Sequence, residues 1–175
     1  MRQTKKITLS AIMVAMGVAF LSIGALIEIM DLAISAFASL IMVFVCLEIG
    51  KPYNFLVWLA TSLLSFVFFP HSLVFLTYFL VFGLYPIIKA YIERLPRFLW
   101  IILKLVYINI VIAALFFLCE LITSVPLFDA GLAPWLKIGA VALINLAFIV
   151  YDMFLVVMIR YYLFKIRPRF QKYLK

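Results

Sequence analysis

Charged and metal-binding side chains are scarce in this chain of 175 residues. Only 13% of the residues are charged, and the chain has two cysteines and a single histidine, His71. A soluble domain would carry about 25% charged residues. The scarcity of charge therefore excludes a water-soluble globular protein and a disordered chain. Cys46 and Cys119 lie in apolar runs without a Cys-x-x-Cys motif or a histidine pair, so the sequence predicts no metal site and no other cofactor.

Catalytic motifs are missing as well. The sequence contains no Gly-x-Ser-x-Gly, no His-Glu-x-x-His and no aspartate-rich motif of the kind that binds polyprenyl or CDP-alcohol substrates. It also lacks a nucleotide-binding loop, so the chain cannot use ATP by itself. We therefore predict that the protein is not an enzyme. A lipid-active enzyme would require Glu28, Asp31, Glu120 or His71 to converge within hydrogen-bonding distance.

Long apolar runs dominate what is present. Hydrophobic residues make up 69% of the chain, and the mean hydropathy is +1.28. Each run is long enough to cross a hydrocarbon layer about 30 Å thick at about 1.5 Å per helical residue. The sequence thus predicts an all-α polytopic membrane protein, a single transmembrane domain over residues 1–175 in which six helices form a compact bundle. The predicted helices cover residues 8–26, 32–49, 53–69, 72–91, 98–122 and 135–164.

Basic residues gather on one side of this predicted bundle. Thirteen of the 15 basic residues fall on the side that holds both chain ends, and Lys104 and Lys137 are the exceptions. The opposite side carries the acidic residues Glu28, Asp31, Glu120 and Asp129. Lysine and arginine flanking membrane spans favour the cytoplasmic side. We therefore predict a multi-pass protein of a bacterial-type cell membrane with both termini in the cytoplasm. The basic clusters would contact membrane lipid rather than nucleic acid.

Two opposite charges lie at matching depth on neighbouring predicted helices. Asp152 precedes Arg160 by eight residues, and Lys104 follows Arg97 by seven, which places each about 10–12 Å from the cytoplasmic interface. An ion pair between Lys104 and Asp152 would remove two large desolvation penalties together. We predict a structural clamp. A proton or ligand relay and the absence of any contact remain the alternatives.

Other polar side chains also fall inside the last two predicted helices. Asn109 and Glu120 share one stripe of the fifth helix, and Asn145 lies two turns before Asp152 on the sixth. Hydrogen bonding between helices explains such residues without any ligand. The functional alternative is that Asn109, Glu120 and Asn145 line a cavity that opens to the outside.

The fourth predicted helix carries an aromatic stripe. Tyr78, Phe82, Tyr85 and Lys89 follow helical spacing, and a tyrosine hydroxyl inside a span must find a partner, so this face should point inward. It forms either packed core or the wall of a ligand site. Pro86 should kink this helix because it lacks an N–H and clashes with the preceding turn.

The first predicted helix opens with small side chains at four-residue spacing. Ala11 and Ala15 recur within the segment Lys5-Lys6-Ile7-Thr8-Leu9-Ser10-Ala11-Ile12-Met13-Val14-Ala15, and small residues let helix backbones approach closely in lipid. With six predicted spans and cytoplasmic ends, this opening segment resembles the S components of energy-coupling factor transporters, the membrane subunits that capture a vitamin or other micronutrient.

This resemblance implies a function and partners. Ala11 and Ala15 would dock on a transmembrane coupling (T) subunit, which is driven by a separate pair of ATPases. A small organic solute would bind near the outer face, with Tyr78, Tyr85, Asn109, Glu120 and Asn145 as candidate substrate-binding residues. Two departures from the family matter: the predicted first outer loop, residues 27–31, is short, and the N-terminus lacks the histidine of nickel- and cobalt-specific members.

From this resemblance we predict the substrate-binding subunit of a vitamin-type importer. The alternative is a non-transporting membrane scaffold of a cell-envelope assembly, similar to rod-shape proteins. In a scaffold the alanine stripe would be a permanent interface and side chains would fill the interior. A wet pocket lined by tyrosine and asparagine would favour binding, and a dry packed interior would favour the scaffold.

Overall fold

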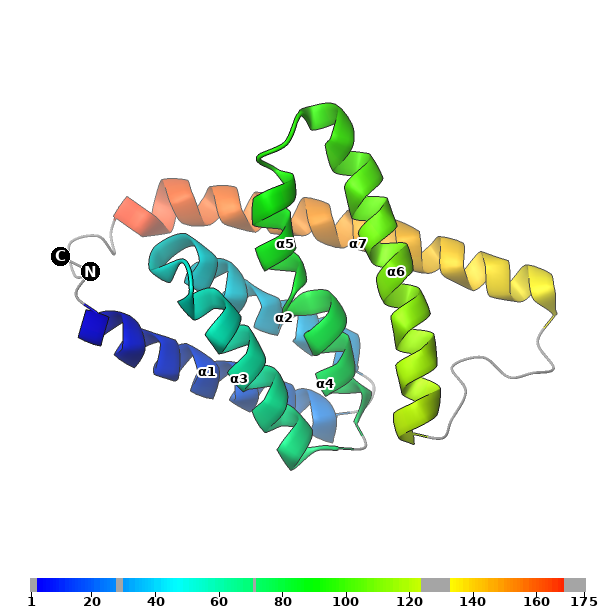
Figure 1. Ribbon diagram of the computed structural model, residues 1–175, viewed down its shortest axis with the longest axis horizontal. Helices are drawn as coiled ribbons and strands as arrows, with labels where there is room; N and C mark the ends of the chain where they lie inside the picture. Colours follow the sequence, from blue (N-terminus) through cyan, green and yellow to red (C-terminus); the bar gives the residue numbers. More distant parts are fainter. Residues whose placement is uncertain (1–2, 28–29, 71, 124–132, 169–175) are drawn as a thin grey trace.

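Every regular element in the described part of the chain is a helix. The computed structural model describes residues 3–27, 30–70, 72–123 and 133–168, and Figure 1 shows their arrangement. The helices are α1 (Gln3–Leu26), α2 (Asp31–Phe44), α3 (Tyr53–Phe68), α4 (Leu73–Thr77), α5 (Tyr85–Ile92), α6 (Arg97–Thr123) and α7 (Pro134–Tyr161), with wider π-helical turns η2 (Val45–Ile49), η3 (Tyr78–Phe82) and η4 (Tyr162–Ile166). The predicted all-α class is confirmed.

Five of the described helical segments are long and apolar enough to cross a membrane. They are Gln3–Leu26, Asp31–Ile49, Val74–Ile92, Arg97–Leu121 and Pro134–Ile166. The apolar helix α3 is shorter, with 16 residues, and spans about 24 Å at helical rise. These segments are compatible with a multi-pass membrane protein.

Helix α1 packs against α2 and α3 through its small residues. Ser10, Gly17 and Gly24 recur every seventh position and are buried, so they form one stripe along the helix. At Gly17 the fit is tight, because a Cβ added there would lie 2.9 Å from the Thr61 methyl carbon. Close backbone approach of this kind suits helices packed in lipid, where van der Waals contact drives association.

The fourth predicted span is interrupted. The Gly83 N–H donates to the Tyr78 carbonyl at 2.7 Å, which closes the wide turn η3, and α5 then begins with Pro86 in its first turn. A wide turn of this kind leaves some backbone carbonyls without a partner in their own helix, so they accept hydrogen bonds from other donors. The Trp58 indole donates to the Phe79 carbonyl at 3.0 Å. The kink expected at Pro86 is thus a break just before it.

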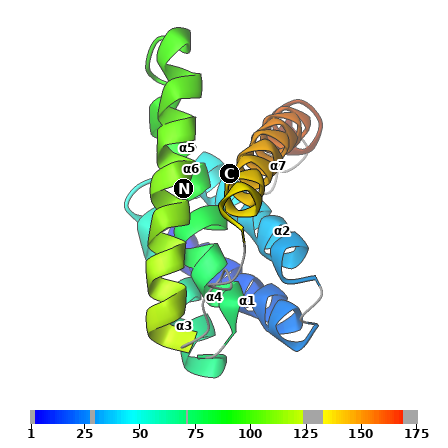
Figure 2. The same ribbon diagram turned by 90° about the vertical axis from the view of Figure 1, so that its right-hand side faces the viewer.

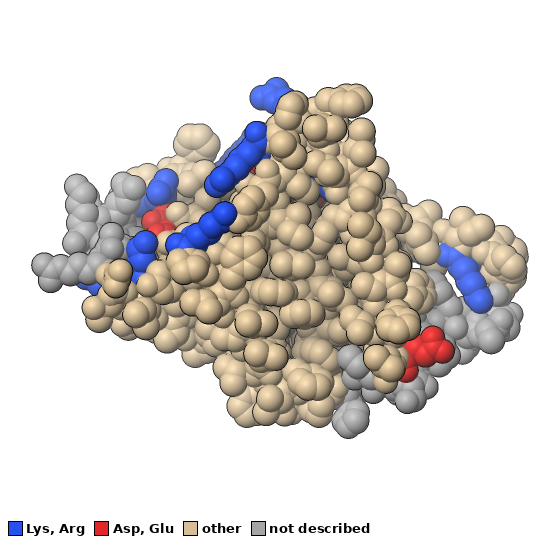
Figure 3. All heavy atoms as spheres, viewed as in Figure 1, with Lys and Arg blue, Asp and Glu red and all other residues tan. Residues whose placement is uncertain are grey.

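Helices α6 and α7 are the longest, with 27 and 28 residues. They cross and then diverge toward their ends, as the two views in Figures 1 and 2 agree. Helix α1 begins at the end of the molecule where η4 finishes. Most basic side chains visible in Figure 3 gather toward that end and toward the turn between α5 and α6. We call the side of the molecule that carries both of these places the basic end.

Candidate functional site

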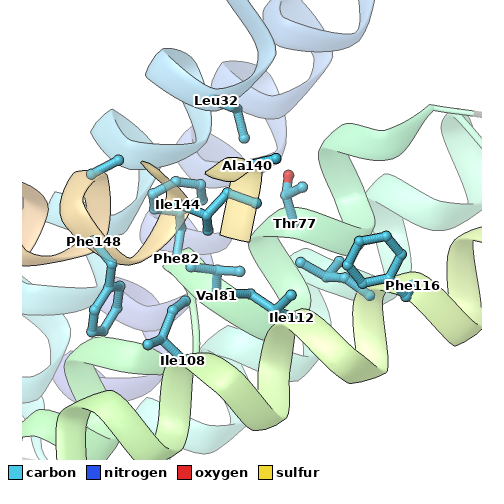
Figure 4. Close-up of a pocket in the computed structure, with 12 residues that line it drawn as sticks. Leu32, Thr77, Val81, Phe82, Ile108, Ile112, Phe116, Ala140, Ile144 and Phe148 are labelled. Carbon is cyan, nitrogen blue, oxygen red and sulfur yellow. The ribbon is translucent and has the colours of Figure 1, made fainter. Parts of the chain in front are cut away.

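A cavity of about 390 Å³ lies between α2, α4, η3, α6 and α7. It occupies the region where α6 and α7 diverge away from the basic end, and Figure 4 shows the side chains that surround it. The stretch of α6 that faces it runs from Ile108 to Phe116, and that of α7 runs from Ala140 to Phe148. The lining residues are Leu32, Thr77, Val81, Phe82, Ile108, Ile112, Leu115, Phe116, Ala140, Ile144, Ala147 and Phe148.

The lining of this cavity is apolar. Among the described residues that line it, Thr77 is the one polar residue, and the Thr77 hydroxyl donates to the Val74 carbonyl at 3.0 Å. Ordered water needs two to four polar partners, so an apolar cavity of this kind offers water little. Its size falls within the range of about 300–1,000 Å³ that is typical of ligand pockets. The cavity therefore suits an apolar ligand or the apolar part of one.

The two candidate tyrosines lie elsewhere in the core. Tyr78 and Tyr85 are 1% and 0% exposed, and neither lines the cavity. The Tyr85 ring stacks on Tyr107 at 5.6 Å and meets Phe148 edge-on at 4.7 Å between centroids. Because the cavity ends at Phe148, this aromatic cluster forms its floor toward the basic end.

The two candidate asparagines bind each other across α6 and α7. Asn109 Nδ2 donates to Asn145 Oδ1 at 3.2 Å, and Asn145 Nδ2 returns a bond to Asn109 Oδ1 at 3.4 Å. Each side-chain amide also donates to a backbone carbonyl in its own helix, that of Leu105 at 2.8 Å or Val141 at 2.9 Å. All four amide hydrogens therefore have acceptors without any ligand, and neither side chain lines the cavity.

A second hollow of about 370 Å³ shares Phe116 with the cavity. It is lined by Phe116, Lys137, Ile138 and Val141, and we call it the Lys137 basin. Glu120 lies one helical turn beyond Phe116 and is exposed, but it lines neither hollow.

Opposite charges meet in the half of the bundle near the basic end. Lys104 Nζ lies 2.6 Å from Asp152 Oδ2, as predicted from their depth. Lys89 of α5 also pairs with Asp152, and it lies 2.9 Å from Glu93. The Tyr85 hydroxyl donates to Asp152 Oδ1 at 2.5 Å. We call these five residues the charge network.

The charge network balances its own charge. Its two lysines and two carboxylates sum to zero, and Lys89 is only 2% exposed. Buried charges are tolerated where partners and hydrogen bonds compensate the lost hydration. Glu93 and the pairing of Lys89 are not among the contacts predicted from the sequence. The four-residue spacing of Lys89 and Glu93 is a usable signal.

The alanine stripe of α1 points away from the bundle. Ala11 and Ala15 are exposed, whereas Ser10 and Gly17 on the neighbouring face are buried. The residues that pack α1 within the chain are therefore different from those that the resemblance assigns to partner docking.

The remaining candidates give no further site. Glu28, His71 and Asp129 lie outside the described residues, so the convergence that a lipid-active enzyme requires is not described. Among the residues that are described, no three histidine, cysteine, aspartate or glutamate side chains are grouped to hold a metal ion. No protein-family model, curated protein or solved structure matches this chain.

Proposed function

We propose that this protein is the substrate-binding membrane subunit of an importer of the energy-coupling factor type, and that it captures a small organic, vitamin-like solute. The cavity between α6, α7 and η3 is the observation that carries the proposal. It is large enough for a ligand, and it lies in the half of the molecule away from the basic end. A scaffold has no need of such a hollow.

The proposal places the protein in the membrane as six spans. Helix α3, a shorter apolar helix, would be the sixth crossing beside the five longer segments, and an even number would return both chain ends to one side. The basic end would face the cytoplasm, in keeping with the positive-inside rule. The cavity would then belong to the outer half of a bacterial-type cell membrane.

The half near the basic end would act as a seal. The charge network and the aromatic cluster around Tyr85 fill the interior between the cavity and that end. These described side chains would block a bound solute from passing through the bundle, and release inward would require a rearrangement. Energy for that step would come from a T subunit and its ATPase pair, since the chain has no nucleotide-binding motif of its own.

The exposed alanines of α1 support docking on such a subunit. Ala11 and Ala15 leave a shallow surface on which a partner helix approaches closely. Because neither residue packs the bundle's interior, Ala11→Leu and Ala15→Leu should abolish association with the T subunit while the fold remains. Ala142→Leu, at an exposed position of α7, is the matched control and should leave association intact.

The test combines native mass spectrometry and co-purification from the source membrane in a mild detergent. The proposal predicts a retained small molecule, together with a T subunit and ATPases that are lost in the Ala15→Leu variant and kept in Ala142→Leu. Unchanged co-purification of Ala15→Leu, or a protein that retains no small molecule and no such subunits, would contradict it.

A membrane scaffold is the second candidate. The observation in its favour is that Asn109 and Asn145 satisfy each other and that the cavity lining is apolar, so the expected wet pocket of tyrosine and asparagine is not formed at this cavity. A scaffold would retain protein partners permanently, and filling the cavity would not change its function.

A further inference from the structure

The cavity and the Lys137 basin together have the chemistry of an amphiphile site. The cavity is lined by apolar side chains, the basin is lined by Lys137 and three apolar residues, and Phe116 lines both. We propose that they bind a single-chain anionic amphiphile of the long-chain carboxylate type, with the chain in the cavity and the carboxylate at the Lys137 ammonium group. This inference rests on the proposed function and names its substrate class.

The cavity fits one hydrocarbon chain. Its 390 Å³ is about 13 times the ~30 Å³ that a water molecule takes in the liquid, which suits on the order of a dozen methylene groups. Thr77, the one polar residue in the described part of the lining, already donates its hydroxyl hydrogen within α4. A polar solute would therefore lose its hydration without gaining hydrogen bonds. An apolar chain has no hydrogen bonds with water to lose, and it makes van der Waals contacts with side chains that the diverging helices leave without neighbours.

Lys137 supplies the head-group partner. It is half-buried and forms no ion pair with any described residue. It is also the one basic residue that the topology places on the outer side, against the bias of the rest of the chain. A carboxylate beside the ammonium group would form a charge-assisted hydrogen bond. Among the described residues that line the basin, Lys137 is the one with a charge, and its side chain lies beside three apolar residues.

The volume separates this ligand from a bilayer phospholipid. A phospholipid has two chains, whereas the cavity accommodates one. A free long-chain carboxylate matches both the single apolar chamber and the single cation.

Photo-crosslinking of the full chain in phosphatidylcholine nanodiscs tests the inference. The probe is dodecanoate with a diazirine near its methyl end, and excess dodecanoate or dodecanol serves as competitor. We expect labelling that dodecanoate suppresses and that maps to residues 108–116 of α6 and 140–148 of α7.

Two variants separate the chain from the head group. Ala140→Phe fills the cavity and should remove the competed labelling, whereas Ala142→Phe, exposed on another face of α7, should keep it. Lys137→Gln should raise the dodecanoate concentration needed for half-competition about tenfold, the loss expected for a hydrogen bond to a charged group. Competition by dodecanol should not change in that variant.

Labelling that no competitor reduces, or that Ala140→Phe leaves unchanged, would overturn the chain site. Equal competition by dodecanol and dodecanoate, unaltered by Lys137→Gln, would overturn the anionic head and identify the occupant as a bilayer lipid chain. A polar solute retained by the native protein in mass spectrometry would overturn this inference while leaving the proposed function standing.

Discussion

The α1–α3 layer and the α6–α7 pair hold their helices together by opposite means. In the first, buried Gly17 and Gly24 bring backbones close enough that an added Cβ would press on a neighbouring side chain. In the second, an added Cβ at Gly139 of α7 meets nothing within 4 Å, and side chains at Asn109–Asn145 and Lys104–Asp152 join the helices. Van der Waals contact stabilises the first region along the length of its helices, whereas the two polar pairs join α6 and α7 at separate positions. The cavity lies beyond these pairs, where α6 and α7 diverge.

The charge network should give the largest effect on stability. Asp152→Asn leaves two lysines facing Glu93 alone, so we expect the free energy of unfolding to fall by about 3–5 kcal/mol. Denaturant titration of the protein in mixed micelles measures this.

The matched variant adds Lys104→Gln to Asp152→Asn. It leaves the Lys89–Glu93 pair, which lies at 2.9 Å and is neutral by itself, so much of the lost stability should return. Asp152→Asn with wild-type stability would show that the network does not hold the α6–α7 half together.

Substitution of glycine by alanine should lower the free energy of unfolding in the first region and raise it in the second. Gly17→Ala places its Cβ 2.9 Å from the Thr61 methyl carbon and should cost about 1–3 kcal/mol through overpacking. Gly139→Ala enters open space and should stabilise the helix by about 0.5–1 kcal/mol. Unfolding free energies in the same micelles compare the two.

Thr61→Ser in the Gly17→Ala background provides the control. It removes the methyl group that the new Cβ meets and should recover part of the loss. Equal effects of alanine at Gly17 and Gly139 would remove the contrast between the tight and the open region.

The asparagine pair should give the smallest effect. A double-mutant cycle of Asn109→Ala and Asn145→Ala should yield a coupling of about 0.6 kcal/mol, and no more than about 1.7 kcal/mol, as for other hydrogen bonds between helices in lipid. Solute binding should remain. If the variants lost solute binding and the cycle showed no coupling in the free energy of unfolding, the asparagines would contact a solute and not each other.

Hydrophobic run length and depth along a helix were enough to predict much of this structure. The observed ranges of α2–η2 and α6 lie close to the predicted spans, because run length reflects membrane thickness. The contact between Lys104 and Asp152 followed from counting residues to the basic clusters, since helical rise converts sequence distance into depth. Helix α1 begins at Gln3 rather than near Thr8, because polar residues also continue a helix beyond the apolar run.

Contacts set by tertiary packing were not accessible in this way. The α1 sequence offers two small-residue stripes, one with Ala11 and Ala15 and one with Gly17 and Gly24, and no periodicity states which stripe faces inward. The break at Gly83 depends on hydrogen bonds that the Trp58 indole and the Tyr107 hydroxyl, both distant in sequence, donate to the carbonyls of η3. The cavity arises from the divergence of α6 and α7, which their apolar composition does not encode.

The side of the membrane toward which the cavity and the Lys137 basin face tests the central claim most directly. Single cysteines are introduced as Lys137→Cys at the basin and Lys51→Cys at the basic end, in a chain whose Cys46 and Cys119 are replaced by alanine. Intact cells are treated with a membrane-impermeant maleimide. The account predicts that Lys137→Cys is labelled at once and Lys51→Cys only after permeabilisation. The reverse pattern would place the cavity on the cytoplasmic side and contradict capture of a solute from outside.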